Sequence, residues 1–527
     1  MALSDWAWSY SDWLLLLIGL GLVLYYWGMS PYTRYMKQNI PYKQPLPFIG
    51  NMATALIKKQ TFPDMILDVY GKHKQHACSA LFMFQQPTIV LYDLDLIKTV
   101  AVKDFEYFTD HRTTVFDYGD PLWRKGLFTL KGRRWRDMRS TLSPAFTSSK
   151  MKNMFVLMSE CCQQLVNFLD QCYQKPHAKD SFIKKEGDIL VLELKDFYTR
   201  YATDVIATTA FGIGVDSLKQ PRNEFFMMGQ SATNFGPVKM FLFLSIPRLL
   251  QTLGLSLVPG KIADFFRSLV KDTISTRERE GIVRPDMLQL LMQAKKGTLQ
   301  DENCTEQKNS KTQLDDEDIT AQAVIFFLAG FDTTSTLLCF TTHQLAVHPD
   351  VQTRLQKEID DTLKECDGKL TYEALFGMKY LDMVVSETLR LYSPAAAVDR
   401  LCVRKYTLKT DPPIELKPGD NLFIPIFGLH RDPKYYPDPE RFDPERFSDE
   451  NKHKINPMAY LPFGVGPRIC IGNRFALMEA KLAVVHLLAR YNVKVVPKTP
   501  IPIKIEQKGF NMTIRGGFWL GLEQRRA

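Results

Sequence analysis

The most informative ten residues of the chain read FGVGPRICIG and run from Phe463 to Gly472. They fit the pattern F-x-x-G-x-R-x-C-x-G at every fixed position. Gly464, Gly466 and Gly472 permit tight turns and a close approach of the backbone to a flat cofactor. Cys470 in such a loop can present a thiolate to a metal, with backbone N–H donors that tune its basicity. A buried cysteine among glycines is by itself more often structural, so the other motifs have to decide.

A second motif lies within a long apolar helix that the hydrophobic pattern predicts over residues 316–347. It reads AGFDTT, from Ala329 to Thr334. Gly330 and the two threonines are poor formers of a helix interior, each costing up to about 1 kcal/mol relative to alanine. Asp332 is a charge that is expensive to bury. A site of small-residue packing is the alternative, but an ordinary packing helix does not need this combination.

Two weaker motifs accompany these. The segment ETLR places Glu387 and Arg390 on one helix face. An ion pair of this kind on a protein surface stabilises the helix by only about 0.2–0.5 kcal/mol. The segment FDPERF, which contains Arg446, follows later in the chain. In WRDMR, Trp135 and Arg139 share a helix face, from which an indole N–H and a guanidinium can hold an anionic group.

Together the four motifs resemble those of the cytochrome P450 family of haem-thiolate monooxygenases, over roughly Pro41 to Gly521. The resemblance implies a single-domain cytochrome P450 fold, mostly α with small β-sheets (α+β), and a haem b cofactor. It implies that Cys470 is the axial ligand of the haem iron, where a thiolate donates electron density and favours O–O cleavage. It also implies that Asp332 and Thr333 relay protons to dioxygen from a kinked helix above the haem.

The resemblance assigns further roles residue by residue. Structural roles on the proximal side fall to the buried triad of Glu387, Arg390 and Arg446. Cofactor-binding roles fall to Trp135, Arg139, Arg400 and Arg468 at the haem propionates, and to Phe463, Cys470 and Gly472 of the ten-residue motif. Substrate-contacting positions, each of which fits an ordinary core position equally well, are Val115, Phe116, Phe225, Phe226, Phe326, Phe327, Ala329, Ala396, Val398 and Met512.

The N-terminal end predicts a membrane anchor. Residues 13–33 carry no formal charge, and at ~1.5 Å per residue a helix of this length crosses a hydrocarbon core. Acidic residues precede this span and basic residues follow it, which places the body of the protein in the cytoplasm. A cleaved signal peptide is the alternative, but it would begin with basic residues. We expect a lumenal N-terminus (1–12), a transmembrane anchor (13–33), a proline-rich hinge (34–51) and a cytosolic haem-binding domain (52–527), on the endoplasmic reticulum.

The hinge departs from the family pattern, because Pro41-Tyr42-Lys43-Gln44 stands where the family often has Pro-Pro-Gly-Pro. The hinge, the segment Phe108–Arg112 and the spacing of Arg400 and Cys402 are most similar to insect microsomal members of the drug-metabolising clan.

Composition and the remaining patterns narrow the alternatives. The 527 residues are 45% hydrophobic and 24% charged, which excludes disordered, collagen-like and coiled-coil chains. The net charge of +9 comes without a long basic block, so we expect no nucleic-acid partner. Nine cysteines without a CxxC pair, and no HExxH or phosphate-loop motif, argue against zinc and nucleotide sites.

The remaining patterns predict local structure. Strand-like runs cover residues 87–92, 504–506 and 511–514, and residues 296–311 form a surface loop. Region 225–266 is either part of the core or a patch that dips into the membrane.

The sequence therefore predicts a monooxygenase that inserts one atom of O2 into a lipophilic substrate, such as a xenobiotic, insecticide, plant toxin, steroid or fatty acid. Its electrons come from NADPH through a separate NADPH-cytochrome P450 reductase, with cytochrome b5 as an optional second donor. The basic residues beside Trp135 form either a docking patch or a solvated face. A haem-thiolate isomerase or dehydratase acting on peroxides and a non-catalytic haem sensor are the alternatives, and the intact Asp332–Thr333 pair weighs against both.

Overall fold

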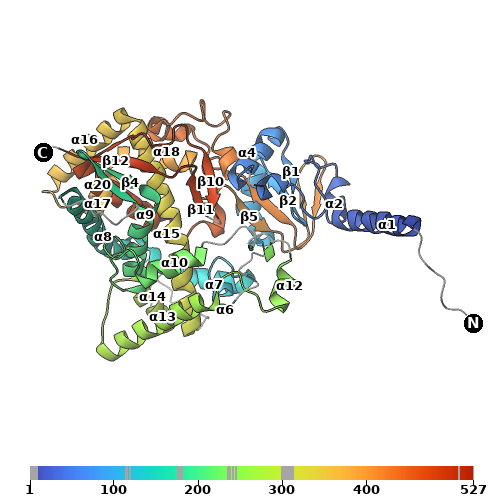
Figure 1. Cartoon of the computed structure of the whole chain (residues 1–527), viewed down its shortest axis with the longest axis horizontal. Helices are drawn as coiled ribbons and strands as arrows, with labels where there is room; N and C mark the ends of the chain where they lie inside the picture. Colours follow the sequence, from blue (N-terminus) through green and yellow to red (C-terminus); the bar gives the residue numbers. More distant parts are fainter. Residues whose placement is uncertain are drawn as a thin grey trace, which may run out of the picture. The chain divides into compact units, whose positions relative to one another are not determined.

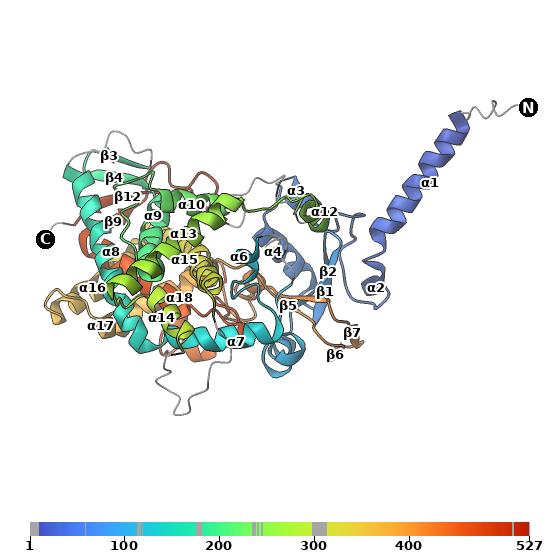
Figure 2. The same cartoon turned by 90° about the horizontal axis from the view of Figure 1, so that it is seen from below.

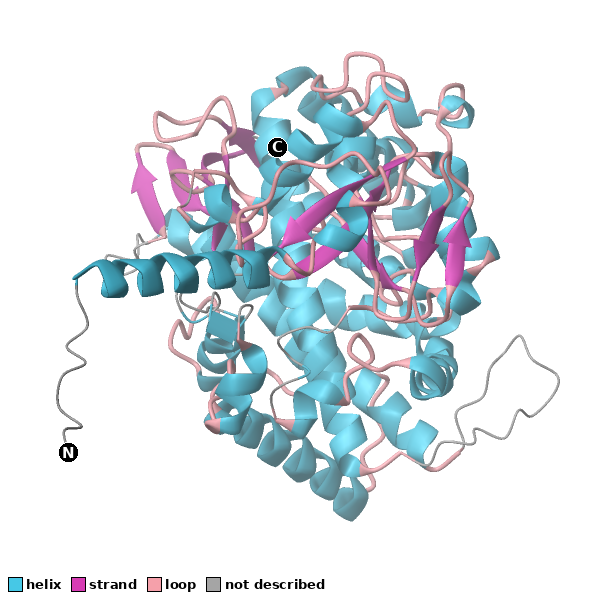
Figure 3. Ribbon diagram, turned by 90° about the vertical axis from the view of Figure 1, so that its right-hand side faces the viewer, coloured by secondary structure: helices cyan, strands magenta, loops and turns pink. Residues whose placement is uncertain are grey.

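The computed structural model describes residues 10–57, 59–112, 117, 120–174, 182–233, 239, 242–243, 246–297, 314–508 and 511–525. Contacts divide the chain into two compact units. Unit 1 comprises Met1–Arg112 and Ala397–Pro425, and unit 2 comprises Thr113–Ala396 and Ile426–Ala527. Helices dominate the described residues and the strands form small sheets (Figure 3), as the sequence predicted. The predicted surface loop at 296–311 lies almost entirely outside the described residues.

Two of the described helices are long and apolar enough to cross a membrane. The first, α1 (Tyr10–Met29), begins unit 1 and exposes most of its leucines. The second, α15 (Asp316–Val347), is mostly buried inside unit 2 and is therefore a core helix. Only α1 leaves its apolar surface uncovered by protein, so α1 is the candidate anchor (Figure 1).

The chain that follows α1 packs onto the sheet of unit 1. Tyr32 is fully buried, and its hydroxyl donates to the Phe84 carbonyl at 2.5 Å. Arg34 forms an ion pair with Asp420 at 2.9 Å. The proline-rich hinge continues as extended chain along the sheet, where Gly50 adopts φ +65° and leaves no room for a Cβ atom.

The main sheet of unit 1 has the strand order β1-β2-β8-β5. Its strands β1 and β2 form an antiparallel hairpin, β2 pairs with β8 in parallel, and β8 pairs with β5 antiparallel. The bounds in this sheet are β1 Cys78–Met83, β2 Gln86–Leu91, β5 Val398–Leu401 and β8 Asn421–Ile424. The other elements of unit 1 are α2 Thr33–Met36, α3 Ala53–Leu56, α4 Phe62–His73, α5 Leu94–Lys98, η1 Thr99–Lys103, η2 Phe105–Tyr107 and the hairpin β6 Tyr406–Leu408 with β7 Ile414–Leu416.

Helix α15 is the central element of unit 2 (Figures 1 and 2). It packs against α9, α20 and α18, which cover it from different sides. A capping box fixes its start: the Asp315 side chain accepts from the Asp318 N–H, and the Asp318 side chain accepts from the Asp315 N–H. The observed bounds coincide with the predicted helix.

The other helices of unit 2 surround α15 or lie on its periphery. They are α6 Pro121–Arg124, α7 Gly132–Leu142, η4 Ser143–Phe146, α8 Ser148–Gln174, α9 Leu194–Ile206, η5 Ala207–Phe211, α10 Glu224–Thr233, α12 Pro247–Thr252, α13 Gly260–Glu280, α14 Met287–Lys295, α16 Pro349–Glu365, α17 Tyr372–Gly377, α18 Lys379–Leu391, α19 Ile426–Leu429, η6 Pro444–Phe447, η7 Lys452–Lys454, η8 Gly466–Arg468 and α20 Asn473–Arg490.

Two sheets complete unit 2. The predicted runs near the C-terminus form the hairpin of β10 (Ile505–Lys508) and β11 (Asn511–Ile514). The second sheet has the order β3-β4-β12-β9, with bounds Ile183–Glu186, Ile189–Glu193, Trp519–Gln524 and Tyr491–Lys494. Strands β3 and β4 were not among the strand-like runs that the sequence predicted, and the C-terminal strand β12 pairs with β4 in this sheet.

Candidate active site

Backbone hydrogen bonds within the ten-residue motif shape the Cys470 loop. The Gly464 N–H donates to the Leu461 carbonyl and the Cys470 N–H to the Phe463 carbonyl, both at 3.0 Å. Gly464 and Gly466 have φ values of +79° and +73°, which glycine adopts without the steric penalty of other residues. Helix α20 begins directly after this loop, so Cys470 lies just before the N-terminus of a helix.

Cys470 is enclosed by protein and yet accessible. Burial raises the pKa of its thiol, whereas the Gly472 N–H and the Arg139 guanidinium oppose that rise by favouring the thiolate. Nevertheless the residue is exposed. A side chain that is surrounded by protein and still accessible faces the inside of unit 2 rather than its outer surface.

Cationic and aromatic groups gather beside this thiol. The Arg468 guanidinium lies 3.9 Å from the centre of the buried Trp135 ring and donates to the Leu130 carbonyl at 2.9 Å. Burial lowers the pKa of Arg139, and the charge of a Cys470 thiolate opposes that shift. Trp135, Arg139 and Arg468 thus form a cluster suited to the carboxylates of a bound cofactor.

One face of α15 stays accessible although the helix is buried on its other faces. Ala329 and Thr333 are exposed and Phe326 is half-buried, and their spacing places all three on one side of the helix. The helix is continuous over its 32 residues. Within it, the Thr333 hydroxyl donates to the Ala329 carbonyl at 2.5 Å, a bond of the kind that can bend a helix.

A lysine that the sequence analysis missed compensates the charge of Asp332. Lys195, in the first turn of α9, places its Nζ 2.8 Å from Oδ1 of Asp332 and 3.2 Å from the Asp332 carbonyl oxygen. The same ammonium donates to the hydroxyls of Ser335 (2.9 Å) and Thr336 (2.7 Å). Lys195 therefore holds the carboxylate on the α9 side of the helix. With 137 residues between the partners, no local pattern could have predicted this pair.

Phe146 joins the cysteine loop to the accessible face of α15. Its ring lies 3.9 Å from the position that a Cβ atom on Gly472 would occupy, and it packs edge-to-face on Phe326 with ring centroids 5.5 Å apart. Phe146 therefore lies between the cysteine loop and the accessible face of α15 and brings the two close together. An accessible thiol, a cationic cluster for carboxylates and an accessible helix face are the parts that a haem requires, so the residues present fit this cofactor.

The predicted structural triad is formed. Arg390 donates to both carboxylate oxygens of Glu387 at 2.7 and 2.8 Å, and the Arg446 guanidinium lies 3.4 Å from the same carboxylate. Glu387 and Arg390 have no accessible surface. Burial raises the pKa of Glu387, and the Arg390 guanidinium opposes this effect most strongly. The Asp443 N–H adds a further bond to Glu387 at 2.9 Å.

A buried histidine connects this triad to the cysteine loop. His430 Nδ1 lies 3.0 Å from the Arg390 carbonyl oxygen, and its Nε2 accepts from the Leu461 N–H at 2.8 Å. Burial lowers the pKa of His430 to about 3, so the ring is neutral, with its proton on Nδ1. The sequence analysis did not single out His430, because its two partners are distant in the chain.

Comparisons with known proteins agree with this geometry. A sequence model described as cytochrome P450 matches residues 40–520. The chain belongs to the cytochrome P450 family. It is 56% identical to cytochrome P450 9e2 of Blattella germanica over 99% of this chain and 98% of that protein. It is 41% identical to probable cytochrome P450 9f2 of Drosophila melanogaster, over 95% of this chain and 97% of that protein. It is 38% identical to cytochrome P450 6k1 of Blattella germanica, over 96% of this chain and 96% of that protein.

Membership establishes the class of chemistry. Cytochromes P450 bind haem b, and this chain is a monooxygenase of that family, of a type typical of insect enzymes that metabolise xenobiotics. The family implies a redox partner and a small-molecule substrate together with O2.

The candidate substrate residues of this P450 divide into two groups. Phe225 and Phe327 are buried against each other with centroids 5.1 Å apart, and Phe226 is buried beneath the Arg200 guanidinium. Ala396 and Met512 are also buried. In contrast, Phe326 and Ala329 keep accessible surface beside Thr333. Val115 and Phe116 lie outside the described residues.

Two predicted site residues belong to unit 1. Arg400 in β5 is buried and donates to the Asp399 carbonyl at 2.7 Å. Burial lowers the pKa of Arg400 to about 10, and the Asp399 carboxylate opposes that shift. Val398, in the same strand, is half-buried.

Proposed function

We propose that this P450 transfers one oxygen atom of O2 to a lipophilic small molecule, with electrons from NADPH delivered by a separate reductase. The observation that carries this proposal is the accessible Thr333 hydroxyl beside Asp332, on the one accessible face of an otherwise buried helix. Monooxygenation consumes two protons per turnover, and groups that can hold and move protons serve it. Rearrangement of a peroxide needs no such supply.

Different residues of the site bind the cofactor, handle protons and contact the substrate. Cys470 would bind the haem iron and the cluster of Trp135, Arg139 and Arg468 its propionates. Bound haem supplies the activation of dioxygen, which no side chain can perform. Thr333 then offers its hydroxyl oxygen as a hydrogen-bond acceptor at the accessible face of α15, while its own proton is donated to the Ala329 carbonyl. Phe326 and Ala329 offer apolar surface there, which suits a lipophilic substrate.

A spectrum and an activity measurement test the proposal. The reduced protein with carbon monoxide, in membranes, should show the red-shifted Soret band of a thiolate-bound haem. With NADPH and reductase it should dealkylate 7-ethoxycoumarin, chosen as a lipophilic probe from a small panel of fluorogenic ethers. Turnover of an organic hydroperoxide alone, with no product from any panel member in the presence of NADPH, would instead establish the isomerase alternative. Reversible binding of the probes without turnover in either assay would establish the sensor.

The membrane placement is part of the same proposal. Helix α1 is the single-pass anchor into the endoplasmic reticulum, with the basic residues after it on the cytoplasmic side. Exposed apolar residues around α12 form a second contact with the lipid; they are Leu242, Ile246, Leu249, Leu253 and Leu255. Phe266, from the same predicted region, is core. Removal of α1 together with Leu249→Asp should release the protein from microsomes in low salt, whereas removal of α1 alone should not.

The reductase is proposed to dock on α7. Arg133, Arg134 and Arg136 are exposed on the faces of α7 that the buried Trp135 does not occupy. Electron donors with acidic surfaces are attracted to such a patch, and the attraction falls with ionic strength. Arg134→Glu should slow reduction by reductase and weaken its salt dependence while leaving the carbon monoxide spectrum of dithionite-reduced protein unchanged. Equal reduction rates at low salt would exclude this patch.

A further inference from the structure

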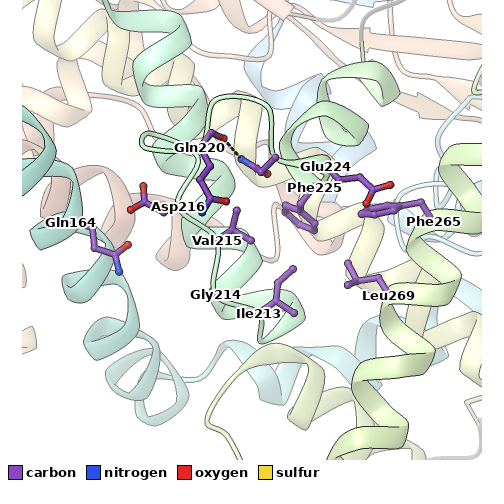
Figure 4. Close-up of a pocket in the computed structure, with 11 residues that line it drawn as sticks. Gln164, Ile213, Gly214, Val215, Asp216, Gln220, Glu224, Phe225, Phe265 and Leu269 are labelled. Atoms are coloured by element: carbon purple, nitrogen blue, oxygen red, sulfur yellow. Dashed lines mark hydrogen bonds between the residues drawn. The ribbon is translucent and has the colours of Figure 1, made fainter. Parts of the chain in front are cut away.

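Unit 2 contains a pocket to which the proposed reaction gives no role (Figure 4). Its volume is about 510 Å³, within the range of about 300–1,000 Å³ that is usual for small-molecule sites. Residues of α8, of the loop between η5 and α10, of the start of α10 and of α13 line it. The pocket is therefore large enough for a ligand that contains an aromatic ring.

The ionisable groups of this pocket are acidic. Among the described residues that line it, Asp216 and Glu224 carry charge, and no lining residue is basic. The Lys219 N–H donates to Oδ1 of Asp216 at 3.0 Å and holds this carboxylate in place. The Lys219 ammonium lies 3.3 Å from the other oxygen, but both side chains are partly exposed (46% and 30%). Since exposed pairs contribute only about 0–1 kcal/mol, a cationic ligand can take the place of this ammonium.

The rest of the lining suits the carbon atoms of such a ligand. Phe225 and Phe265 contribute aromatic rings, and Val215 and Leu269 contribute aliphatic surface (Figure 4). The face of an aromatic ring attracts a cation, and the attraction adds to that of a carboxylate. Carboxylates beside aromatic rings fit an organic ammonium ion, whereas they repel an anion.

Phe225 connects the pocket to α15. Its ring centroid lies 5.1 Å from that of Phe327, which in turn stacks on Phe331 at 4.9 Å. Gly229, one turn after Phe225 on α10, is pressed against the same ring, because a Cβ atom there would lie 2.1 Å from Phe327. A core packed this closely transmits a displacement of one ring to the next. A ligand that moves Phe225 therefore acts on the turn of α15 that also carries the accessible Phe326.

We propose that this pocket binds an organic ammonium ion, and that its occupancy changes the affinity of the accessible face of α15 for substrate. Asp216 and Glu224 bind the positive charge, and Phe225 and Phe265 contact the hydrocarbon part. The cation site is independent of the monooxygenase function; the coupling rests on the proposed binding of lipophilic substrates beside Thr333. Coupling between two ligand sites is usually about 5–150-fold, and it is reciprocal.

Benzyltrimethylammonium tests the site in the full-length haem protein. It combines one aromatic ring with a permanent charge, and its nitrogen has no lone pair with which to bind the haem iron. Calorimetry should show saturable binding that Asp216→Asn and Glu224→Gln each weaken about fivefold. Benzenesulfonate, which has the same ring and the opposite charge, should not bind. Equal binding of both ions, or binding that neither variant weakens, would overturn the proposal.

Glu280→Gln is the matched control for these variants. Glu280 is the last residue of α13 and is exposed. It lies roughly 16 Å along this helix from Leu269, which is beyond the screening length of ~8 Å at physiological salt. The variant loses the same charge and should bind benzyltrimethylammonium like the wild type. An equal loss of affinity would show attraction by the whole acidic surface and would overturn the assignment to the pocket.

Gly214→Leu tests the pocket by its shape. A Cβ atom on Gly214 would meet no other atom within 4 Å, so the leucine side chain fills the pocket while both carboxylates remain. We expect an unchanged carbon monoxide spectrum and loss of benzyltrimethylammonium binding. Retained affinity in the folded variant would overturn the site. If Gly214→Leu fails to fold, the charge variants decide.

Equilibrium dialysis of 7-ethoxycoumarin tests the coupling. Saturating benzyltrimethylammonium should change the affinity for 7-ethoxycoumarin at least fivefold, to a limiting value, and Gly214→Leu should abolish this change. An unchanged affinity would overturn the coupling, and competition without a limit would show that both ligands occupy the substrate site. Wild-type protein that shows both effects but forms no product with NADPH and reductase would refute the monooxygenase function and leave this inference intact.

Discussion

Replacement of Glu387 by glutamine should remove much of the stability of unit 2. Both Glu387 oxygens accept from Arg390 at 2.7 and 2.8 Å, and neither residue has accessible surface. Glutamine leaves one oxygen and turns the other position into an N–H donor that faces a guanidinium donor. Removing one partner of a buried ion pair in this way costs about 3–5 kcal/mol. Because whole proteins are stable by only ~5–15 kcal/mol, this loss is a large share of the total.

The chain offers a matched control for this prediction. Glu445→Gln also breaks a pair with an arginine, Arg354, but both side chains of that pair are about half exposed (46% and 57%). Exposed pairs contribute only about 0–1 kcal/mol. Membranes with each variant are incubated in increasing urea, and the thiolate carbon monoxide band is recorded. We expect Glu387→Gln to lose the band at a much lower urea concentration than Glu445→Gln. Coincident transitions would refute the view that the buried triad holds the proximal side together.

Three further changes have defined outcomes. Thr333→Ala should retain haem and substrate binding but divert electrons to hydrogen peroxide, and tight coupling in that variant would deny Thr333 a role in proton supply. Gly229→Ala would place a Cβ atom 2.1 Å from the Phe327 ring, so we expect a loss of about 1–3 kcal/mol in thermal stability; an unchanged midpoint would show that the ring moves freely. Burial raises the pKa of Asp204 from 3.8 to about 7, so its protonated form stabilises the fold at low pH and this contribution is lost as the pH rises through 7. The urea midpoint should therefore fall between about pH 4 and 7 in the wild type and stay flatter in Asp204→Asn, which keeps an oxygen for the Ser217 N–H; parallel pH profiles would contradict this.

The sequence predicted those helices, strands and loops whose form depends on residues close together in the chain. The bounds of α15 follow from a continuous apolar run and the capping box of Asp315 and Asp318, both readable in sequence. The pairing of β10 with β11 follows from the strand-like runs at 504–506 and 511–514. The cysteine motif predicted tight turns at three glycines; Gly464 and Gly466 adopt the positive φ values that favour glycine, whereas Gly472, at φ −92°, does not.

Residues that act across the chain were not predicted. The Lys195–Asp332 pair and the two partners of His430 join segments separated by tens to hundreds of residues, and only packing brings them together. The same holds for β3 and β4, whose place in a sheet depends on the C-terminal strand β12. The role of Phe146 was not predicted either, because it depends on contacts of its ring with Gly472 and with Phe326 of α15, which are distant in the sequence.

The packing of the chain just after α1 bears on how a water-soluble form of the enzyme should be designed. A Cβ atom on Gly28 would lie 2.7 Å from the Phe48 ring, and the Tyr32 side chain is wholly enclosed within unit 1. The last turn of α1 is thus a fitted part of unit 1, not a detachable leader. Removal of the chain through Arg34 would leave an unfilled hole beneath Phe84 and take away the ion-pair partner of Asp420. Expression of a chain that starts at Trp27 or Gly28 should yield the more soluble and stable protein, because it discards the exposed leucines of α1 and keeps the buried Tyr32.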